Sequence, residues 1–187
     1  MSGHNKWAQI KHKKQATDAT KSRVFSRYAR LIALESKKAG GVLTSPGLAS
    51  AIARAKAINM PKDNIDRAVA KGASKDAAAL EVVVYEAYGP GGSALIIDAL
   101  TDNKNRTTQE IKHLLASYGA EVSPPGAASW AFTKTPDSKY TPHEPLIDLT
   151  DAEGERLGAI LEALDEHEDV QQIFTNARDF GGMDDEE

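Results

Sequence analysis

The first residues of the chain combine a tryptophan with positive charge. Trp7 lies in a run that also contains two histidines and four lysines: His4, Lys6, Lys11, His12, Lys13 and Lys14. Lysines neutralise phosphates and an aromatic ring stacks on an unpaired base, so these residue types are typical of a site for single-stranded or looped nucleic acid. The indole would equally serve to pack this segment onto the rest of the protein, and the sequence leaves both interpretations open.

Two further groups of cations have helical spacing. Arg23, Arg27 and Arg30, together with Lys37, fall within an arc of about 80° at 100° per residue. No carboxylate interrupts this arc, which favours a phosphate-facing surface, although such a ridge can also serve solubility alone. A second group points outward from a later helical segment: Lys62, Arg67 and Lys71.

Arg106 ends a polar, turn-prone stretch at residues 101–107 that leads into a helix. A cation beside the free N–H groups of a helix N-terminus can receive a phosphate. Asp102 and Asn103 are also ordinary turn and capping residues, and the sequence slightly favours this second interpretation.

No motif for catalysis or for metal binding stands out. The five histidines lack metal-ligand spacing, and the chain has no cysteine. The glycine-rich residues 89–92 lack the Lys-Ser/Thr pair of a phosphate-binding loop and predict a hairpin turn. Because no nucleophile is spaced with a base, we expect a protein that is not an enzyme and needs no metal or other cofactor.

The charge of the chain is divided between its two halves. The 187 residues carry a net charge of −4, but residues 1–75 hold 16 Lys+Arg and 4 acidic residues, a net of +12. The remaining residues hold 7 and 23, a net of −16. Such asymmetry is typical of a nucleic-acid-binding half joined to a half with another task, and it indicates a domain boundary near residues 72–79.

Apolar periodicity predicts helices in the basic half and strands mixed with helices in the acidic half. Helices are expected over residues 18–39, 45–59 and 62–71, as a three-helix unit without helix-turn-helix spacing. In the acidic half we expect strands at 80–88, 93–100, 128–133, 146–149 and 170–175. Two helices complete it, one beginning with a capping box at Thr107–Glu110 and one over 151–166.

The expected fold is therefore multi-domain, with an N-terminal three-helix domain followed by a ferredoxin-like α/β domain. Its parts are a basic arm (1–16), the helical domain (17–75), the α+β domain (79–180) with a loop at 133–145, and a disordered acidic tail (181–187). No run of about 18 apolar residues is present, and no apolar segment follows the basic N-terminus. These features predict a cytoplasmic protein without a membrane partner; a monomer is favoured, although the sequence does not fix the oligomeric state.

Strings spread over most of the chain resemble the signatures of one family. They are GHNKW at 3–7, IKHKK at 10–14, NMPKDNIDRA at 59–68, YEAYGPGG at 85–92, TDNKNRT at 101–107 and DVQQIFTNA at 169–177. Together, and in this order, they resemble the YebC/PmpR family, to which the mitochondrial translational activator of cytochrome c oxidase is related.

The resemblance implies a helical first domain and an α/β second domain into which a third domain is normally inserted. Here only residues 133–145 occupy the place of that insertion, so the chain resembles a shortened, two-domain member. Relatives are described as DNA-binding transcriptional regulators and as ribosome-associated translation factors that ease elongation through stretches such as consecutive prolines. We expect nucleic acid as the partner, with rRNA or tRNA on the ribosome favoured over DNA, because an extended arm suits irregular RNA better than duplex readout. A protein-interaction module that uses the acidic half is a further alternative.

Overall fold

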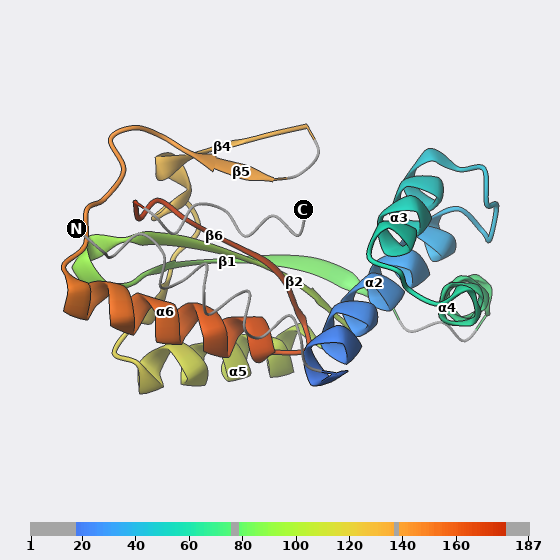
Figure 1. Cartoon of the computed structure of the whole chain (residues 1–187), viewed down its shortest axis with the longest axis horizontal. Coiled ribbons are helices and arrows are strands. Elements are labelled where there is room, and N and C mark those ends of the chain that lie inside the picture. The colour runs from blue at the N-terminus through green and yellow to red at the C-terminus, as the bar shows by residue number, and fades with distance from the viewer. Residues whose placement is uncertain (1–17, 76–78, 137–138, 179–187) are drawn as a thin grey trace. The chain divides into compact units, whose positions relative to one another are not determined.

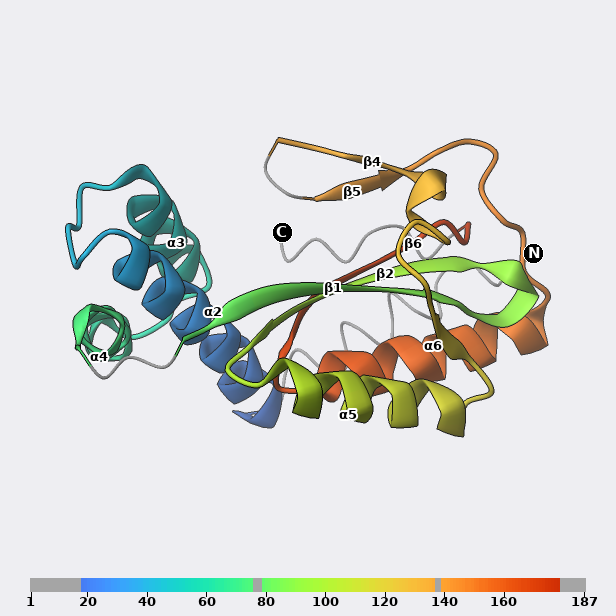
Figure 2. The same ribbon diagram turned by 180° about the vertical axis from the view of Figure 1, so that it is seen from behind.

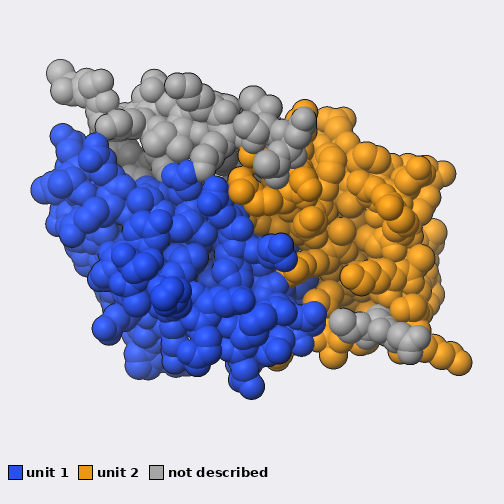
Figure 3. Space-filling model, turned by 90° about the horizontal axis from the view of Figure 1, so that it is seen from below, with its two compact units in different colours: residues 1–13, 82–187 blue, residues 14–81 orange. Residues whose placement is uncertain are grey.

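A computed structural model describes residues 18–75, 79–136 and 139–178 of the chain. The described residues form two compact units, which Figure 3 colours separately. The helical unit contains the described residues up to Glu81, and the α/β unit contains those from Val82 onward. The expected basic arm and acidic tail lie outside the described residues.

The helical unit consists of α2 (Asp18–Lys38), α3 (Pro46–Ala57) and α4 (Lys62–Ala73), which confirms the three helices expected from the sequence (Figure 1). Helix α3 begins as a capped helix should, because the Ser45 hydroxyl accepts a hydrogen bond from the Leu48 amide and proline occupies the first turn. One hydrophobic core holds the helices together: Tyr28, Ile32, Leu48, Ala51, Ala55, Met60, Ile65 and Ala68.

Small residues allow α2 and α4 to cross closely. Gly72 of α4 lies against the backbone of α2, and a Cβ atom added there would be 2.2 Å from the carbonyl oxygen of Ala33. Beside this point the Ser36 hydroxyl, which is fully buried, donates a hydrogen bond to the Val69 carbonyl at 2.8 Å. The crossing therefore depends on the absence of a side chain at Gly72.

The α/β unit is built on a four-stranded sheet with the order β3-β1-β2-β6. Strands β1 (Glu81–Tyr88) and β2 (Ala94–Thr101) flank the short turn η1 (Pro90–Gly92), as expected for the hairpin. Strand β6 (Val170–Thr175) pairs antiparallel with β2, and β3 (Glu121–Ser123) pairs antiparallel with β1.

Helices α5 (Lys104–Ser117) and α6 (Asp151–Glu166) cover one face of this sheet (Figures 1 and 2). Alternate residues of the strands, such as Leu95 and Ile97, point toward the helices and form the main core with Ile111, Leu115 and Leu161. An antiparallel sheet with both helices on one face is the ferredoxin-like arrangement that was expected, so the predicted fold class is confirmed.

The opposite face of the sheet carries a second, smaller core under a short hairpin. After the turn η2 (Ser129–Ala131), strand β4 (Phe132–Lys134) pairs with β5 (Tyr140–Pro142). The underlying core consists of Ala94, Ile96, Ala128, Ala131, Phe132 and Phe174. The expected loop at 133–145 is thus wrong in part, because the segment pairs with itself and packs its aromatic residues on the sheet.

Three other local expectations are wrong. Residues 128–133 were expected to be one strand, but 129–131 form η2 and only 132–133 belong to strand β4, while β3, which is only three residues long, was missed. Residues 146–149 contribute a single bridge between Ile147 and Ala177 in place of a strand. Helix α5 begins at Lys104, not at a capping box, because the Asn103 side chain accepts the amide of Arg106 and caps the helix earlier.

None of the helices in the described parts of the chain has both the length and the apolar composition that crossing a bilayer requires.

Candidate nucleic-acid interface

Seven of the residues expected to bind nucleic acid precede the described part of the chain. They are His4, Lys6, Trp7, Lys11, His12, Lys13 and Lys14. Their role therefore stays a prediction, and the structure bears only on the cations of α2, α4 and α5.

The three arginines of α2 are partly buried, whereas Lys37 is exposed. Leu34 lies on the same arc of the helix as Arg23 and Arg27, and it is only 8% exposed. The helical spacing expected from the sequence is present because α2 is one continuous helix. Because Leu34 is buried, part of this side of α2 is not exposed. The exposed strip of positive charge along α2 is therefore narrower than the sequence suggested.

The three cations of α4 are all exposed, but they do not share one face. Arg67 and Lys71 are one turn apart, while Lys62 projects from the other side of the helix. The Arg67 side chain also bends back along α4, where its Nε donates to the Asp63 carbonyl at 3.2 Å and its Nη2 to the Asn64 side chain. Arg67 and Lys71 are therefore the pair on α4 that one phosphate backbone can contact together.

Arg106 faces carboxylates. Its Nη2 atom lies 2.9 Å from Oδ2 of Asp169 and 3.1 Å from Oδ1 of Asp102, and its Nε lies 3.7 Å from Oε2 of Glu110. The hydrogen bond and the charge of Asp169 raise the pKa of Arg106 above its usual value. With three carboxylates this close, the guanidinium has little attraction left for a phosphate, and the surroundings of Arg106 weigh against its expected role.

The carboxylate of Asp169 is the centre of this network. Its side chain is only 2% exposed, and its Oδ2 atom also accepts the Thr107 hydroxyl at 2.6 Å. The hydroxyl of Thr107 thus links α5 to the start of β6, and it does not cap the helix. The network joins two elements of the α/β unit, which is a structural task.

Glu110, His167 and Asp169 bring three metal-ligand types together, with one ligand atom from each within 4.8 Å of the others. Sequence spacing could not reveal this group, because Glu110 lies far from the other two along the chain. The His167 Nδ1 atom accepts the Asp169 amide at 3.2 Å, and its Nε2 atom lies 3.2 Å from Glu110. Since the Arg106 guanidinium already lies against both carboxylates, a metal ion would have to displace it.

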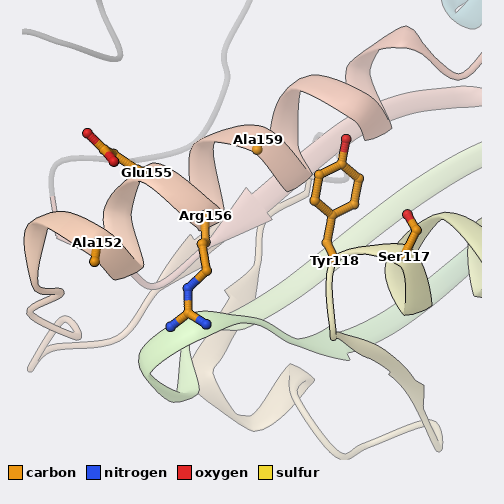
Figure 4. A pocket seen from close by; sticks show the side chains of 6 residues that line it. All are labelled: Ser117, Tyr118, Ala152, Glu155, Arg156 and Ala159. Carbon is orange, nitrogen blue, oxygen red and sulfur yellow. The ribbon is translucent and has the colours of Figure 1, made fainter.

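An open hollow of about 510 Å³ lies between the end of α5 and the first half of α6 (Figure 4). Its lining residues are Ser117, Tyr118, Ala152, Glu155, Arg156 and Ala159. The Ser117 hydroxyl donates to the Leu114 carbonyl at 2.6 Å, and no histidine lines the hollow. The carboxylate in the lining, Glu155, points away from Ser117 in Figure 4, so the hollow does not present a nucleophile beside a base.

The loop at residues 124–131 was not expected from the sequence. Glu86 of β1 accepts hydrogen bonds from three backbone amides of this loop, and Trp130 projects from it with 66% of its surface exposed. The available signal was the glycine at position 126 after two prolines, because glycine readily adopts the positive φ, here +90°, that such a turn requires.

Two family models match this chain. The model described as the TACO1/YebC protein N-terminal domain matches residues 5–75, and the model described as the TACO1/YebC second and third domain matches residues 80–137. The boundary between the two matches lies within a few residues of the boundary between the two compact units.

Two similar proteins come from Thermotoga species. A probable transcriptional regulatory protein of Thermotoga petrophila is 42% identical over 177 residues, which cover 94% of this chain and 70% of the relative. A protein of the same description from Thermotoga maritima is 41% identical over 98% of this chain and 65% of its own length. The chain thus spans about two thirds of the length of these relatives.

A solved structure has the same fold. The crystal structure of a conserved hypothetical protein from Aquifex aeolicus superposes with a TM-score of 0.80 and 27% identity, over 92% of this chain and 96% of that one. The family models, the relatives and the fold agree, and we conclude that the chain belongs to the TACO1/YebC family.

Proposed function

We propose that this protein is a nucleic-acid-binding regulator of gene expression, and that it acts as a ribosome-associated translation factor. The observation that carries the proposal is the division of charge, with +12 on residues 1–75 and −16 on the rest. A polyanion is attracted to the first and repelled by the second, so the helical unit and the arm are the contact surface.

The roles of individual residues follow from their chemistry. Lys6, Lys11, Lys13 and Lys14 neutralise phosphates in a confined RNA site, while Trp7 or His4 stacks on a base. The arginines of α2 hold the flank of the site, with Arg67 and Lys71 of α4 as further contacts. Help to elongation, including through proline-rich stretches, would come from positioning tRNA or rRNA, since no side chain among the described residues is arranged for covalent chemistry.

Binding to duplex DNA as a transcriptional regulator is the second candidate. It is favoured by the description of the Thermotoga relatives as probable transcriptional regulatory proteins. Readout of duplex sequence requires an element inserted into a groove. The helical half lacks the helix-turn-helix spacing that would insert a helix into a groove. RNA is therefore preferred to duplex DNA as the partner.

Cosedimentation with ribosomes, compared with binding to a promoter duplex, tests the choice. We expect the protein to pellet with ribosomes and to bind the duplex weakly, and we expect the triple change of Lys11, Lys13 and Lys14 to Ala to abolish pelleting. The matched control changes three lysines of the acidic half, Lys104, Lys112 and Lys139, to Ala and should leave pelleting intact. Pelleting that survives the first triple change contradicts the role of the arm, and preference for the duplex supports the second candidate.

The salt dependence of RNA binding tests the mode of contact. Six phosphate contacts to a single strand give a slope of log K against log salt near −4, because about 0.7 counterion is released per contact. Arg106→Gln should leave this slope unchanged, since its carboxylate partners already neutralise it. A flat salt response would exclude binding through phosphates. A partner that remains bound after nuclease treatment would instead favour a protein-interaction module.

A further inference from the structure

The loop that carries Trp130 is held in place by the buried carboxylate of Glu86. Oε1 of Glu86 accepts the Gly126 amide at 2.8 Å, and Oε2 accepts the amides of Ala128 at 2.7 Å and Ser129 at 2.8 Å. Glu86 is only 9% exposed. A carboxylate that receives three backbone donors fixes the path of the loop, because moving the loop would leave a buried charge without partners.

The indole itself is held in one orientation. Nε1 of Trp130 donates to the Tyr88 hydroxyl oxygen at 3.0 Å, and that hydroxyl in turn donates to the Ala127 carbonyl. Ala128, which precedes the turn η2, and Ala131, its last residue, are buried on the sheet. The small residues thus anchor the turn, and the largest side chain of the segment is left facing solvent.

Packing does not require this exposed ring. An indole contributes to stability by being buried, whereas this one is 66% exposed and still has its edge fixed by a hydrogen bond. Exposed aromatic residues in a rigid setting are typical of binding surfaces, because little conformational entropy is lost when a partner covers them.

The charges along this segment favour an anionic partner more than those of the rest of the acidic half do. Residues 122–143 contain two lysines and one aspartate, whereas residues 144–169 contain ten acidic residues and one arginine. On the neighbouring hairpin, Nζ of Lys134 lies 5.4 Å from the centre of the Tyr140 ring. The segment is therefore a part of the acidic half that a polyanion can approach with least repulsion.

We propose that Trp130 is a stacking platform for an unpaired base of single-stranded RNA, and that Lys134 attracts the adjoining phosphate. This second contact, on the α/β unit, rests on the proposed function and adds a base contact to the phosphate contacts of the basic half. A flat aromatic face accepts any base, so the contact strengthens binding without reading sequence.

Tryptophan fluorescence isolates this site, because the chain has only two tryptophans. In the full-length Trp7→Phe protein, Trp130 is the only tryptophan emitter. Titration with a dye-labelled oligouridine should quench its emission at the same concentrations at which the anisotropy of the dye rises.

Affinity variants complete the test. In the full-length protein, Trp130→Ala should weaken oligouridine binding about tenfold, the effect of losing one stacked base, and Trp130→Phe should restore most of it. The matched control is Tyr118→Ala, which removes another exposed aromatic ring from the α/β unit and should leave the affinity unchanged. Circular dichroism of each variant confirms that the fold is kept.

The outcomes separate the two proposals. Normal anisotropy binding with neither quenching of Trp130 nor an effect of Trp130→Ala overturns the platform and leaves the proposed function intact. The absence of any salt-dependent binding to RNA overturns the proposed function and the platform together. Trp130→Ala that releases a nuclease-resistant protein partner, with RNA affinity unchanged, assigns the ring to a protein interface and overturns the base-stacking role.

Discussion

Two carboxylates on the same face of the sheet have opposite environments. Burial raises the pKa of Glu86, but the amides of Gly126, Ala128 and Ser129 outweigh this effect, and its pKa lies below the usual value. Burial raises the pKa of Asp98 to about 6, and Lys134 offsets only part of the effect. Oδ1 of Asp98 is buried without a hydrogen-bond partner among the described residues. The ionised Glu86 side chain thus stabilises the fold, whereas the ionised Asp98 side chain destabilises it.

Replacing Glu86 should weaken the loop that carries Trp130. We expect Glu86→Gln to lower the free energy of unfolding by about 2 kcal/mol at neutral pH, because charge-assisted hydrogen bonds to three amides are lost. The folded-state pKa is depressed, so this contribution is fully present above the ordinary pKa of about 4.3 and is lost as the pH falls through the lower folded value. Urea unfolding at a series of pH values checks this, and equal acid sensitivity of both proteins would contradict it.

Replacing Asp98 should have the opposite effect. The folded-state pKa of about 6 exceeds the ordinary value, so the ionised group costs stability at neutral pH, and this cost disappears as the pH falls through 6 toward about 4. We expect Asp98→Asn to raise the free energy of unfolding by about 1–2 kcal/mol near pH 7 and by only about a third as much near pH 4.5, where the folded carboxyl is protonated and the unfolded one is still mostly ionised. Chemical denaturation at both pH values measures the difference, and a benefit that is independent of pH would exclude titration of Asp98 as its cause.

At the scale of elements, long periodic segments were predictable and short ones were not. The helices at α2, α4 and α6 and the strands β1, β2 and β6 lie close to the positions expected from apolar spacing. Strand β3 is too short to show alternation. It exists because its residues pair with β1, a contact between distant parts of the chain that a local pattern does not contain.

The candidate site shows the same division. The helical spacing of Arg23, Arg27 and Arg30 was readable from the sequence, because α2 fixes it. The carboxylates around Arg106 and the amides around Glu86 come from segments far apart in the chain. Only the packed sheet brings these groups together, and the sequence alone therefore suggested a phosphate contact at Arg106 and overlooked Trp130.

The close packing of α2 against α4 at Gly72 can be tested by substitution. Gly72→Ala should lower the free energy of unfolding of the helical unit by about 1–3 kcal/mol, because the new methyl group would overlap the Ala33 carbonyl. Gly47→Ala is the matched control, since its Cβ would meet only the end of the Glu35 side chain, which can rotate away, and no backbone atom. Thermal unfolding followed by circular dichroism compares them, and equal stability of the two variants would show that the crossing is looser than described.

At the scale of the whole molecule, the division of charge coincides with the division of the fold. Residues 1–75 carry the net positive charge, and the compact units separate at residues 81 and 82. The two halves have separate hydrophobic cores. In the proposed function, the basic half supplies phosphate contacts and the acidic half contributes a base contact at Trp130, so that the two contributions should be separable by experiment.

Fragments of the chain should make this separation measurable. We expect residues 1–75 alone to bind single-stranded RNA with a salt slope only about 0.7 smaller in magnitude than that of the full chain, because the fragment lacks the Lys134 phosphate contact and keeps the others. The affinity should be about tenfold lower, since the stacked base is lost. Residues 79–187 alone should not bind detectably near physiological ionic strength, because their net charge is negative. In the intact chain, the basic half holds the RNA close to Trp130, and this high effective concentration allows the base contact to strengthen binding. Full-length Trp130→Ala should reproduce the affinity of the fragment 1–75, and a fragment slope less than half that of the full chain would instead place most phosphate contacts on the acidic half.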